Sequence, residues 1–515
     1  MNRQIRGLAA ILLACFTLLF VQVNLIQVGN RSCAGAVGAV FGSSTCRDDL
    51  DSDQLNSRAI LRDFTRPRGS IVTADGVVVA KSVDSHDQYV YQRVYPEGSL
   101  YGQVTGYYSF VYGSSGLEKQ YNDDLAGQTL SQQVESLSDL FSNTDTSGNL
   151  TITIRDDLQR TARQALGDKT GSVVVLDPRT GAVLAMWSNP NFDPNPISHH
   201  DTDTDHTARD AKELLDGAAG DPLINAAVGS LEAPGSTFKL VTGSVGVNSG
   251  KVTTDHPSYP NATQYQPPYG SPISNFDGEV CGGTLIHILA VSCNSAFAQM
   301  GTETIGPEAM LAGAARFGFD SKPPIDLPEP KAVSTIRPPK SAEDPNRDFT
   351  RELPQLSLAS IGQGPNVATP LQMAMVTAAI AHDGTIMTPH LLDVVRDSDG
   401  RVTRTWHNRS WRRAISASTA ATMREAMRRV VTDGTASVMA IDGYDIGAKT
   451  GTAETHDNTM NNAWMVSWGA RQGAQPSVVV AVVVPDVPGY GNAATGSRIA
   501  GPIAHTVMQA ALEHS

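Results

Sequence analysis

The chain has 515 residues, of which 40% are hydrophobic and 18% are charged, and its formal net charge is −13. A chain of this length exceeds what one compact core usually holds, so we expect two or three domains. The acidic balance argues against nucleic acid as the main partner, because phosphate binding requires a basic surface.

The N-terminus carries an apolar run, residues 8–28, directly after Arg3 and Arg6. The run has about 21 residues, roughly the length that crosses a bilayer as a helix. The two arginines favour a cytoplasmic tail, residues 1–7, and a single-pass protein of the cell membrane whose remaining chain lies outside. The alternative is a cleaved signal peptide, for which Ala34-Gly35-Ala36 offers a small-residue cleavage site. We favour the retained anchor.

Four of the five cysteines follow the apolar run. In an oxidising exterior they allow two local disulfides, Cys33–Cys46 and Cys281–Cys293, although sequence alone does not fix the connectivity. None of them has CxxC spacing, so neither a zinc site nor a redox motif is expected.

The first extracellular segment, residues 29–148, reads as a small strand-rich domain next to the membrane. Residues 68–80 alternate around an Asp-Gly turn and predict a hairpin. Residues 89–112 are rich in aromatics and glycine and predict strands and turns, whereas residues 117–125 predict a short helix. A polar stretch at 126–148 predicts the domain boundary.

The second domain, residues 149–515, opens with a predicted strand at 150–154 and a helix at 157–166 whose apolar positions recur at helical spacing. A hairpin follows, because residues 171–176 and 182–187 are apolar runs separated by turn residues.

The far end of this domain predicts three more strands, at 445–453, 463–470 and 477–484, and a helix at 502–512. The middle, residues 205–440, reads as helices separated by proline-rich loops. Strands from both ends therefore bracket a helical insertion. This pattern predicts an α+β or layered α/β fold whose sheet is assembled from distant segments.

The first motif with chemical meaning is the S-T-F-K run from Ser236 to Lys239, which follows a Pro-Gly pair. That pair and the apolar run after it predict the start of a helix. A serine in the first turn lies beside unpaired backbone N–H groups, where the positive end of the helix favours a developing anion. Lys239 lies on the same face, and a desolvated, less basic lysine can take the proton of the Ser236 hydroxyl. Alone the signal is weak, because this spacing arises by chance about once in such a chain.

A K-T-G run begins at Lys449 in the predicted strand at 445–453, where a cation is out of place unless it faces a site. Gly451 would let a bound backbone approach closely. Thr450 and Thr452 share one face of the strand. The alternative is an edge-strand lysine beside a bulge glycine.

Between these motifs stands a third, with Ser292 and Asn294 around a cysteine. It is weak alone, because serine and asparagine are common in loops and helix caps. The order of the three motifs within one predicted domain, on the expected helix, loop and strand, is what makes them informative.

Together the three motifs are a signature of β-lactamases and penicillin-binding proteins. The sequence resembles class B penicillin-binding proteins, most closely the PbpA-type transpeptidases of actinobacteria, over nearly its whole length. Secondary motifs on both sides of the predicted domain boundary carry this resemblance. They are Arg68-Gly69-Ser70-Ile71 with Asp75-Gly76, Arg93-Val94-Tyr95-Pro96, Gly113-Ser114-Ser115-Gly116-Leu117-Glu118, Asp177-Pro178-Arg179-Thr180-Gly181 with Asp193-Pro194-Asn195, Gly362-Gln363-Gly364 and Thr369-Pro370-Leu371-Gln372-Met373-Ala374.

The resemblance implies a penicillin-binding transpeptidase fold: a five-stranded antiparallel sheet flanked by helices, with a helical subdomain, behind the anchor and a small pedestal domain. It implies a D,D-transpeptidase that uses no cofactor and is inhibited by β-lactams. Its substrates would be peptidoglycan stem peptides, a D-Ala-D-Ala donor and an amine acceptor, and a membrane glycosyltransferase would be its partner.

The resemblance also implies the roles of the motif residues. Ser236 would attack the donor carbonyl with Lys239 as its base, and Ser292, helped by Lys449, would pass a proton to the leaving nitrogen. The backbone N–H groups of Ser236 and Thr452 would form the oxyanion hole. The residues implied to bind substrate are Asn294 for the donor amide, and Thr450, Gly451 and Thr452, with Lys449, around the terminal carboxylate.

Other functions remain open on sequence grounds. A D,D-carboxypeptidase or β-lactamase uses the same acylation with water as the acceptor, and a β-lactam sensor or scaffold would keep the site and act through partners. A β-lactamase needs a group that activates the deacylating water, and we recognise no motif for such a group between Asn294 and Lys449.

The alternating run from His199 to His206 looks like a metal cluster. No apolar scaffold fixes it, and metal sites need rigid ligands held by surrounding groups. We interpret it as a solvated loop and expect no metal.

Overall fold

The computed structural model describes residues 13, 16–18, 64–87, 89–129, 147–201, 204–328, 331–337, 349, 352–454, 460–487 and 495–513. Contacts divide the chain into two compact units, and the larger one comprises residues 67–84 and 92–515. Apart from residues 13 and 16–18, the predicted anchor lies outside the described residues, as does the predicted Cys33–Cys46 disulfide. No helix within the described residues is long and apolar enough to cross a membrane.

A five-stranded sheet forms the core around which the motif residues gather, and every neighbouring pair of its strands is antiparallel. In spatial order its strands are β17 (Tyr444–Glu454), β18 (Asn461–Arg471), β19 (Val478–Val484), β7 (Gly171–Leu176) and β8 (Val183–Asn189). Strands from both ends of the predicted second domain therefore share one sheet, as expected from the sequence. The VVVAVVV run of β19 is buried throughout, because its β-branched side chains suit a pleated strand that is covered on both faces.

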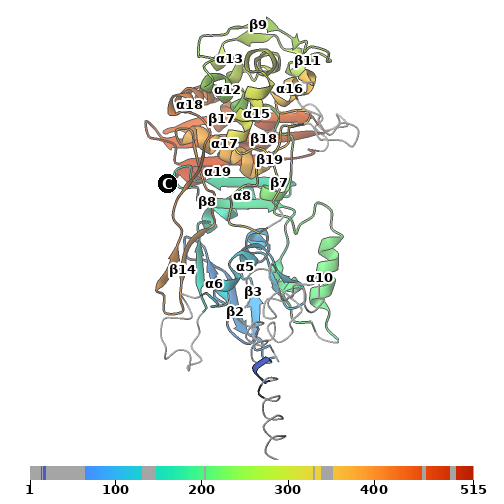
Figure 1. Cartoon of the computed structure of the whole chain (residues 1–515), viewed down its shortest axis with the longest axis vertical. Coiled ribbons are helices and arrows are strands. Elements are labelled where there is room, and N and C mark those ends of the chain that lie inside the picture. The colour runs from blue at the N-terminus through green and yellow to red at the C-terminus, as the bar shows by residue number, and fades with distance from the viewer. Residues whose placement is uncertain are drawn as a thin grey trace, which may run out of the picture. The chain divides into compact units, whose positions relative to one another are not determined.

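Helices cover both faces of this sheet (Figure 1). On one face α8 (Asp156–Leu166) packs against α19 (Gly496–Glu513), whereas α17 (Pro370–Ala381) and α18 (Ala417–Thr432) lie together on the other. All residues of α17 are buried, as expected for a helix that is apolar on every side. The Thr369 hydroxyl caps its N-terminus by accepting from the backbone N–H of Gln372.

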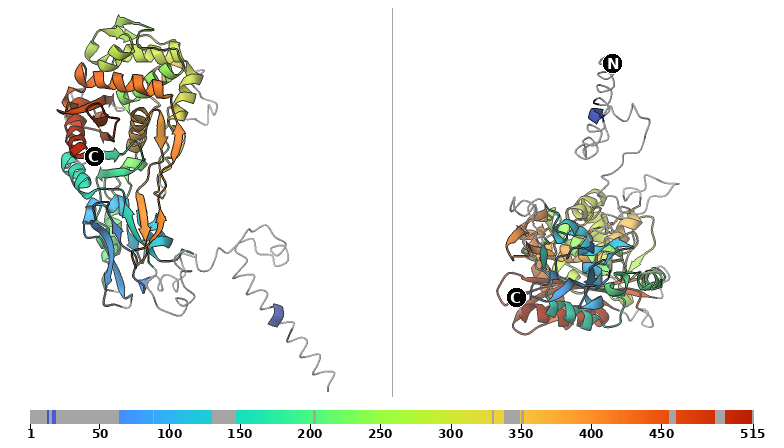
Figure 2. Two further views of the ribbon diagram at one scale, coloured as in Figure 1. Left: turned by 90° about the vertical axis from the view of Figure 1, so that its left-hand side faces the viewer. Right: turned by 90° about the horizontal axis from the view of Figure 1, so that it is seen from below.

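A second, six-stranded sheet has the order β15-β14-β6-β1-β2-β3. The predicted hairpin at 68–80 is confirmed and supplies β1 and β2, and β6 is the strand predicted at 150–154. In Figures 1 and 2 the hairpin of β14 and β15 lies beside these early strands. The strands are β1 (Ile71–Val72), β2 (Val78–Asp84), β3 (Tyr91–Val94), β6 (Asn149–Ile152), β14 (Leu392–Arg396) and β15 (Val402–Thr405).

The six-stranded sheet thus takes strands from both sides of the boundary predicted at residues 148 and 149. β1 pairs with β6 in parallel, and β6 pairs with β14 antiparallel. The division of the chain into residues 29–148 and 149–515 stays a prediction.

A buried charged cluster joins three motifs that are far apart in the sequence. The Glu118 carboxylate, fully buried, accepts from Nε of Arg68 and from Nε of Arg93, both at 2.6 Å. Arg68 also donates to Asn122 Oδ1 at 2.9 Å. Burial alone would raise the pKa of Glu118, but the two guanidinium groups reverse this effect and lower it. The cluster explains why both arginines and the glutamate belong to the secondary motifs.

The middle of the second domain contains the expected helices and, contrary to the prediction, several strands. In Figure 1 its yellow-green helices gather beside β17. Besides α17 and α18, the helices are α10 (Thr207–Asp216), α11 (Ala226–Gly229), α12 (Lys239–Asn248), α13 (Leu285–Ala290), α14 (Asn294–Gln299), α15 (Pro307–Arg316) and α16 (Leu353–Ala359), and the short α9 (Pro194–Ile197) precedes them. The small strand pairs are β9 (Tyr259–Ala262) with β12 (Cys281–Gly283), β10 (Gln264–Tyr265) with β11 (Ile273–Ser274), and β13 (Thr385–Met387) with β16 (Ser410–Arg413).

Three local predictions were wrong in detail. The terminal helix α19 starts at residue 496 rather than 502, because Pro502 is accommodated inside the helix. Residues 89–112 hold helical turns as well as strands, namely η1 (Gly98–Leu100) and α4 (Gly102–Thr105). The helix predicted at 117–125 is broken into α5 (Gly116–Gln120) and α6 (Asn122–Leu125).

Candidate active site

Ser236 lies in a tight helical turn, η3 (Gly235–Phe238), that continues directly into α12. Gly235 has a φ of +52°, and a Cβ atom there would lie 2.5 Å from the Thr452 carbonyl oxygen. Only glycine tolerates both conditions. The backbone of the Ser236 turn therefore runs against strand β17 at Thr452, as the implied oxyanion hole requires.

The Lys239 side chain is fully buried and turned toward the motif of Ser292 and Asn294. Its Nζ lies 2.6 Å from Asn294 Oδ1, 2.7 Å from the Ser292 carbonyl oxygen and 3.3 Å from Ser292 Oγ. The Ser236 hydroxyl makes no hydrogen bond to any residue that the structure describes. Catalytic hydrogen bonds often tighten only when substrate binds, so this geometry is compatible with Lys239 as a base.

Ser292 connects α13 to α14 with a φ of +59°. This left-handed conformation is rare for a residue with a side chain and costs about 1–3 kcal/mol. The turn is held by backbone hydrogen bonds from Ser292 to Leu289 and from Cys293 to Ile288. Its effect is to place the Ser292 hydroxyl between two lysines, 2.8 Å from Lys449 Nζ and 3.3 Å from Lys239 Nζ.

Lys449 and Lys239 are both buried without a carboxylate partner among the described residues. Burial lowers the pKa of Lys449 to about 7. Burial, and then the neighbouring charge of Lys449, hold the pKa of Lys239 well below its ordinary value. An amine that is neutral near pH 7 can accept a proton from a hydroxyl, so the site is equipped for proton transfer.

The K-T-G run lies in β17, which pairs with β18 in a continuous register. A Cβ atom on Gly451 would lie 2.8 Å from the Pro234 carbonyl oxygen, so the backbone that approaches this glycine is the chain's own. Thr450 Oγ1 lies 2.8 Å from Thr435 Oγ1, and Thr452 Oγ1 accepts from the Gly496 N–H at 3.3 Å.

Asn294 is held from both ends of its side-chain amide. Its oxygen accepts from Lys239, and its nitrogen donates to the Ser274 carbonyl oxygen at 3.0 Å. The Ser274 carbonyl oxygen fixes which end is the nitrogen, because a carbonyl oxygen can only accept. The structure thus brings all of the predicted motif residues to one place, while the roles assigned to them stay predictions.

Cys293, between Ser292 and Asn294, forms a disulfide with Cys281 of strand β12, which confirms one of the two predicted pairs. The bond closes a short loop and ties the β9–β12 pair to the turn that carries Ser292.

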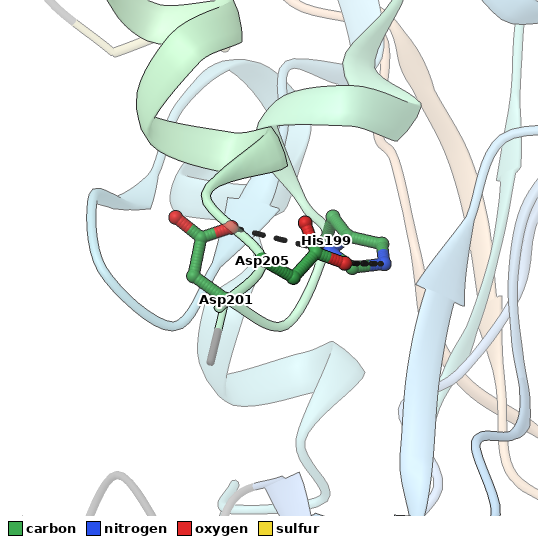
Figure 3. A group of neighbouring side chains, drawn as sticks. All are labelled: His199, Asp201 and Asp205. Carbon is green, nitrogen blue, oxygen red and sulfur yellow. Dashed lines mark ion pairs between the residues drawn. The ribbon is translucent and has the colours of Figure 1, made fainter. Parts of the chain in front are cut away.

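The histidine- and aspartate-rich loop does bring His199, Asp201 and Asp205 together (Figure 3), with one potential ligand atom from each within 4.8 Å of the others. Both carboxylates, however, already serve the start of α10. Asp201 accepts from the backbone N–H of Ala208 at 2.7 Å, and Asp205 accepts from the Thr207 hydroxyl at 2.7 Å. The two carboxylates therefore contribute to capping the start of α10.

Sequence reasoning missed two residues beside the motifs. Thr435 contacts Thr450, and its only local signal is the Asp-Gly turn before it. Glu232, four residues before Ser236, accepts from Asn462 Nδ2 at 2.9 Å. Burial, and then Asp486, raise the pKa of Glu232 to about 7. Neither residue belongs to a short motif. The contact of Glu232 joins residues 230 apart in the sequence, and that of Thr435 joins residues 15 apart across a helical turn and a strand.

Comparison with known proteins agrees with this geometry. Residues 171–509 match the family model of the penicillin binding protein transpeptidase domain, and residues 68–150 match that of the penicillin binding protein A dimerisation domain. A peptidoglycan D,D-transpeptidase PbpA of Mycolicibacterium smegmatis is 35% identical over 526 residues, which cover 99% of either chain. A protein of the same description from Mycobacterium tuberculosis is 33% identical over 533 residues, covering 100% of this chain and 99% of that one.

A solved structure of a penicillin-binding protein has a similar fold. The penicillin G acyl-enzyme complex of penicillin-binding protein A from M. tuberculosis superposes with a TM-score of 0.77 and 31% identity, covering 87% of this chain and 99% of that one. The transpeptidase fold predicted from the resemblance is thereby confirmed. The chain belongs to the penicillin-binding protein transpeptidases, as a class B member of the PbpA type.

Proposed function

We propose that the chain is a peptidoglycan D,D-transpeptidase that works through an acyl-enzyme on Ser236. The observation that carries this proposal is the Ser292 hydroxyl hydrogen-bonded between two buried lysines that lack carboxylate partners. Such an arrangement destabilises the folded chain, because buried charges are ordinarily paired, and this cost is typical of sites where a reaction requires it.

In the proposed acylation, Ser236 Oγ attacks the carbonyl carbon between the two terminal D-alanines of a donor stem peptide. Lys239 takes the hydroxyl proton as Oγ bonds to carbon. The tetrahedral oxyanion is held by the backbone N–H groups of Ser236 and Thr452, and the loss of one such donor typically costs ~100–1,000-fold in rate.

Collapse of this intermediate breaks the carbon–nitrogen bond and releases D-alanine. Ser292 donates its proton to the leaving nitrogen and is reprotonated from Lys449, which lies at 2.8 Å. The amine of a second stem peptide then attacks the ester, which forms the cross-link and returns Ser236 to its hydroxyl form. β-Lactams acylate the same serine, and the resulting acyl-enzyme is hydrolysed slowly.

The substrate contacts that we propose are those that the family resemblance implies. Asn294 would hold the donor amide, and Thr450, Gly451 and Thr452, with Lys449, would surround the terminal carboxylate. The region is cationic when either lysine is protonated, which suits an anionic peptide end.

Fluorescent penicillin labelling tests the nucleophile. Wild type is expected to form a covalent adduct, and Ser236→Ala none. Labelling that persists in Ser236→Ala contradicts the assignment, and an adduct that hydrolyses within seconds favours a β-lactamase. Incubation with a D-Ala-D-Ala peptide and an amine acceptor then separates the two remaining activities, since a cross-linker gives the joined product and a carboxypeptidase gives only the shortened acid.

We also propose that the chain is anchored in the cell membrane by residues 8–28, with the catalytic region outside. The support is the apolar run behind two arginines, together with the Cys281–Cys293 disulfide, which suits an oxidising compartment. Removal of residues 1–28 is expected to shift the chain from the membrane fraction to the soluble one, and continued sedimentation with membranes would contradict the anchor.

A membrane glycosyltransferase is the partner we propose, because stem peptides reach a transpeptidase on glycan strands that another activity polymerises. Chemical cross-linking in cells, followed by recovery of the full-length chain, is expected to yield such an enzyme. Recovery without one would contradict this partner.

A further inference from the structure

One hydroxyl beside the K-T-G run has no role in the mechanism above. Thr435 follows α18, and its Oγ1 lies 2.8 Å from Thr450 Oγ1. Thr435 lies in the connection between α18 and the short helix η6 (Ser437–Met439), and its side chain contacts the K-T-G run from there. We propose that Thr435 is a positioning residue for the substrate carboxylate: its hydroxyl directs the proton of the Thr450 hydroxyl toward that carboxylate. This inference rests on the proposed function.

The backbone holds Thr435 in place from the other side of the site. Its N–H donates to the Ala290 carbonyl oxygen at 3.2 Å, at the end of α13 and two residues before Ser292. A Cβ atom on Gly434 would lie 2.2 Å from the same oxygen, so this close contact depends on a glycine. The Thr435 hydroxyl is therefore fixed relative to both the Ser292 turn and strand β17.

The donor and acceptor count at Thr450 explains why a second hydroxyl matters. A threonine hydroxyl has one proton to donate and accepts through its lone pairs. Lys449 Nζ donates to the Thr450 carbonyl oxygen at 3.0 Å. Its distance to Thr450 Oγ1 is longer, 3.5 Å, so it holds that hydroxyl weakly. Thr435 is thus the close partner that decides where the Thr450 proton points.

When a carboxylate is present, the favourable arrangement is a chain of donors. Thr435 donates to Thr450, and Thr450 donates to the carboxylate, so each hydrogen bond polarises the next. A free carboxylate selects this direction because it can only accept. A ligand without that negative charge gains little binding energy from these two successive hydrogen bonds.

The test compares acylation of the full-length protein by benzylpenicillin and by its methyl ester, which lacks the carboxylate charge. For Thr435→Val, which keeps the shape of the side chain and removes the hydroxyl, the second-order acylation rate with benzylpenicillin is expected to fall roughly tenfold. The rate with the ester is expected to change less than twofold. Thr435→Ser is expected to restore the wild-type ratio of the two rates.

A double variant adds an independent measurement. If Thr435 acts through Thr450, then Thr435→Val in a Thr450→Val background is expected to have little further effect on the benzylpenicillin rate. Equal losses for both probes, a loss that Thr435→Ser fails to restore, or additive losses in the double variant would each overturn the proposal. Failure of the proposed function looks different, since wild type itself would then not be acylated at Ser236.

Discussion

Two buried charge clusters in this protein follow opposite rules. In the six-stranded sheet region, the Glu118 carboxylate lies between Arg68 and Arg93 and accepts from both at 2.6 Å. In the active site, Lys239 and Lys449 are just as buried. Among the described residues, their partners are the Ser292 hydroxyl, which both contact, and neutral carbonyl and amide oxygen atoms. The first cluster is electrically compensated and the second is not.

The difference separates structural from chemical use of buried charge. A paired buried carboxylate keeps its charge and holds segments together, and it resists changes of protonation because its pKa is lowered. The two lysines have no carboxylate partner among the described residues, and both have lowered pKa values; that of Lys449, at about 7, lets it exchange protons near neutral pH. The cost of the unpaired arrangement is tolerated where a reaction needs it.

The largest effect is expected when the uncompensated cluster is dismantled. Lys449→Met should lower the acylation rate by roughly 10²–10⁴-fold, the usual contribution of acid–base catalysis. At pH 7 it should raise the free energy of unfolding by ~1–4 kcal/mol, because an apolar side chain replaces a buried, unpaired amine. Penicillin acylation kinetics and chemical denaturation measure the two quantities.

The stability gain from Lys449→Met should also depend on pH. The unfolded lysine titrates near 10.5 and the folded one near 7, so between these values the unfolded state binds more protons. Wild-type stability therefore rises with pH across this window, and the advantage of the variant shrinks. Lys81→Met, at an exposed lysine of β2, is the matched control and should change neither rate nor stability. A loss of stability in Lys449→Met would mean that Lys449 stabilises the fold, as the Glu118 cluster does.

Breaking the compensated cluster should have the opposite signature. Glu118→Gln leaves two buried guanidinium groups without a counter-charge and should lower the free energy of unfolding by about 3–5 kcal/mol. Denaturant unfolding measures it. At a temperature where the variant remains folded, penicillin acylation should stay within a few-fold of wild type. Asp216→Asn, which removes an exposed i,i+4 pair with Lys212, should cost less than about 0.5 kcal/mol. Equal costs for the two variants would contradict the comparison.

The sequence predicted the reactive cluster better than the structural one. Ser236, Ser292 and Lys449 were found because chemistry requires particular residue types at short spacings, and the helix, turn and strand that carry them have local signals. Glu118 and its two arginines were recognised only as parts of a resemblance. No local pattern shows that a carboxylate will meet guanidinium groups 50 and 25 residues away.

Long-range pairing accounts for the remaining misses. β14 joins the strands near the N-terminus from far along the chain, and a run of alternating residues does not say which strand it will pair with. Thr435 was missed although it is only 15 residues from Thr450, since no local pattern shows that a residue after a helix will contact the following strand. The left-handed conformation of Ser292 is likewise imposed by its surroundings, because isolated serines rarely adopt it.

Glu232 is intermediate between the paired Glu118 and the lysines without a counter-charge, and its replacement should change the free energy of unfolding least of the three. Its carboxyl is mostly buried, with Asn462 as a hydrogen-bond partner but no counter-charge among the described residues, and its pKa is raised to about 7. Between its ordinary value of 4.5 and about 7 the folded state binds more protons than the unfolded state, so wild-type stability falls as pH rises through this window.

Glu232→Gln removes this titration while keeping a group that can accept from Asn462. Relative to wild type, its free energy of unfolding should therefore increase as pH rises from about 4.5 to 7, by on the order of 2 kcal/mol. Denaturant unfolding at several pH values measures the trend, and Glu425→Gln on the exposed side of α18 is the control that should show none. A difference that is constant with pH would mean that Glu232 is charged in the folded state, like Glu118, and that Asn462 alone compensates it.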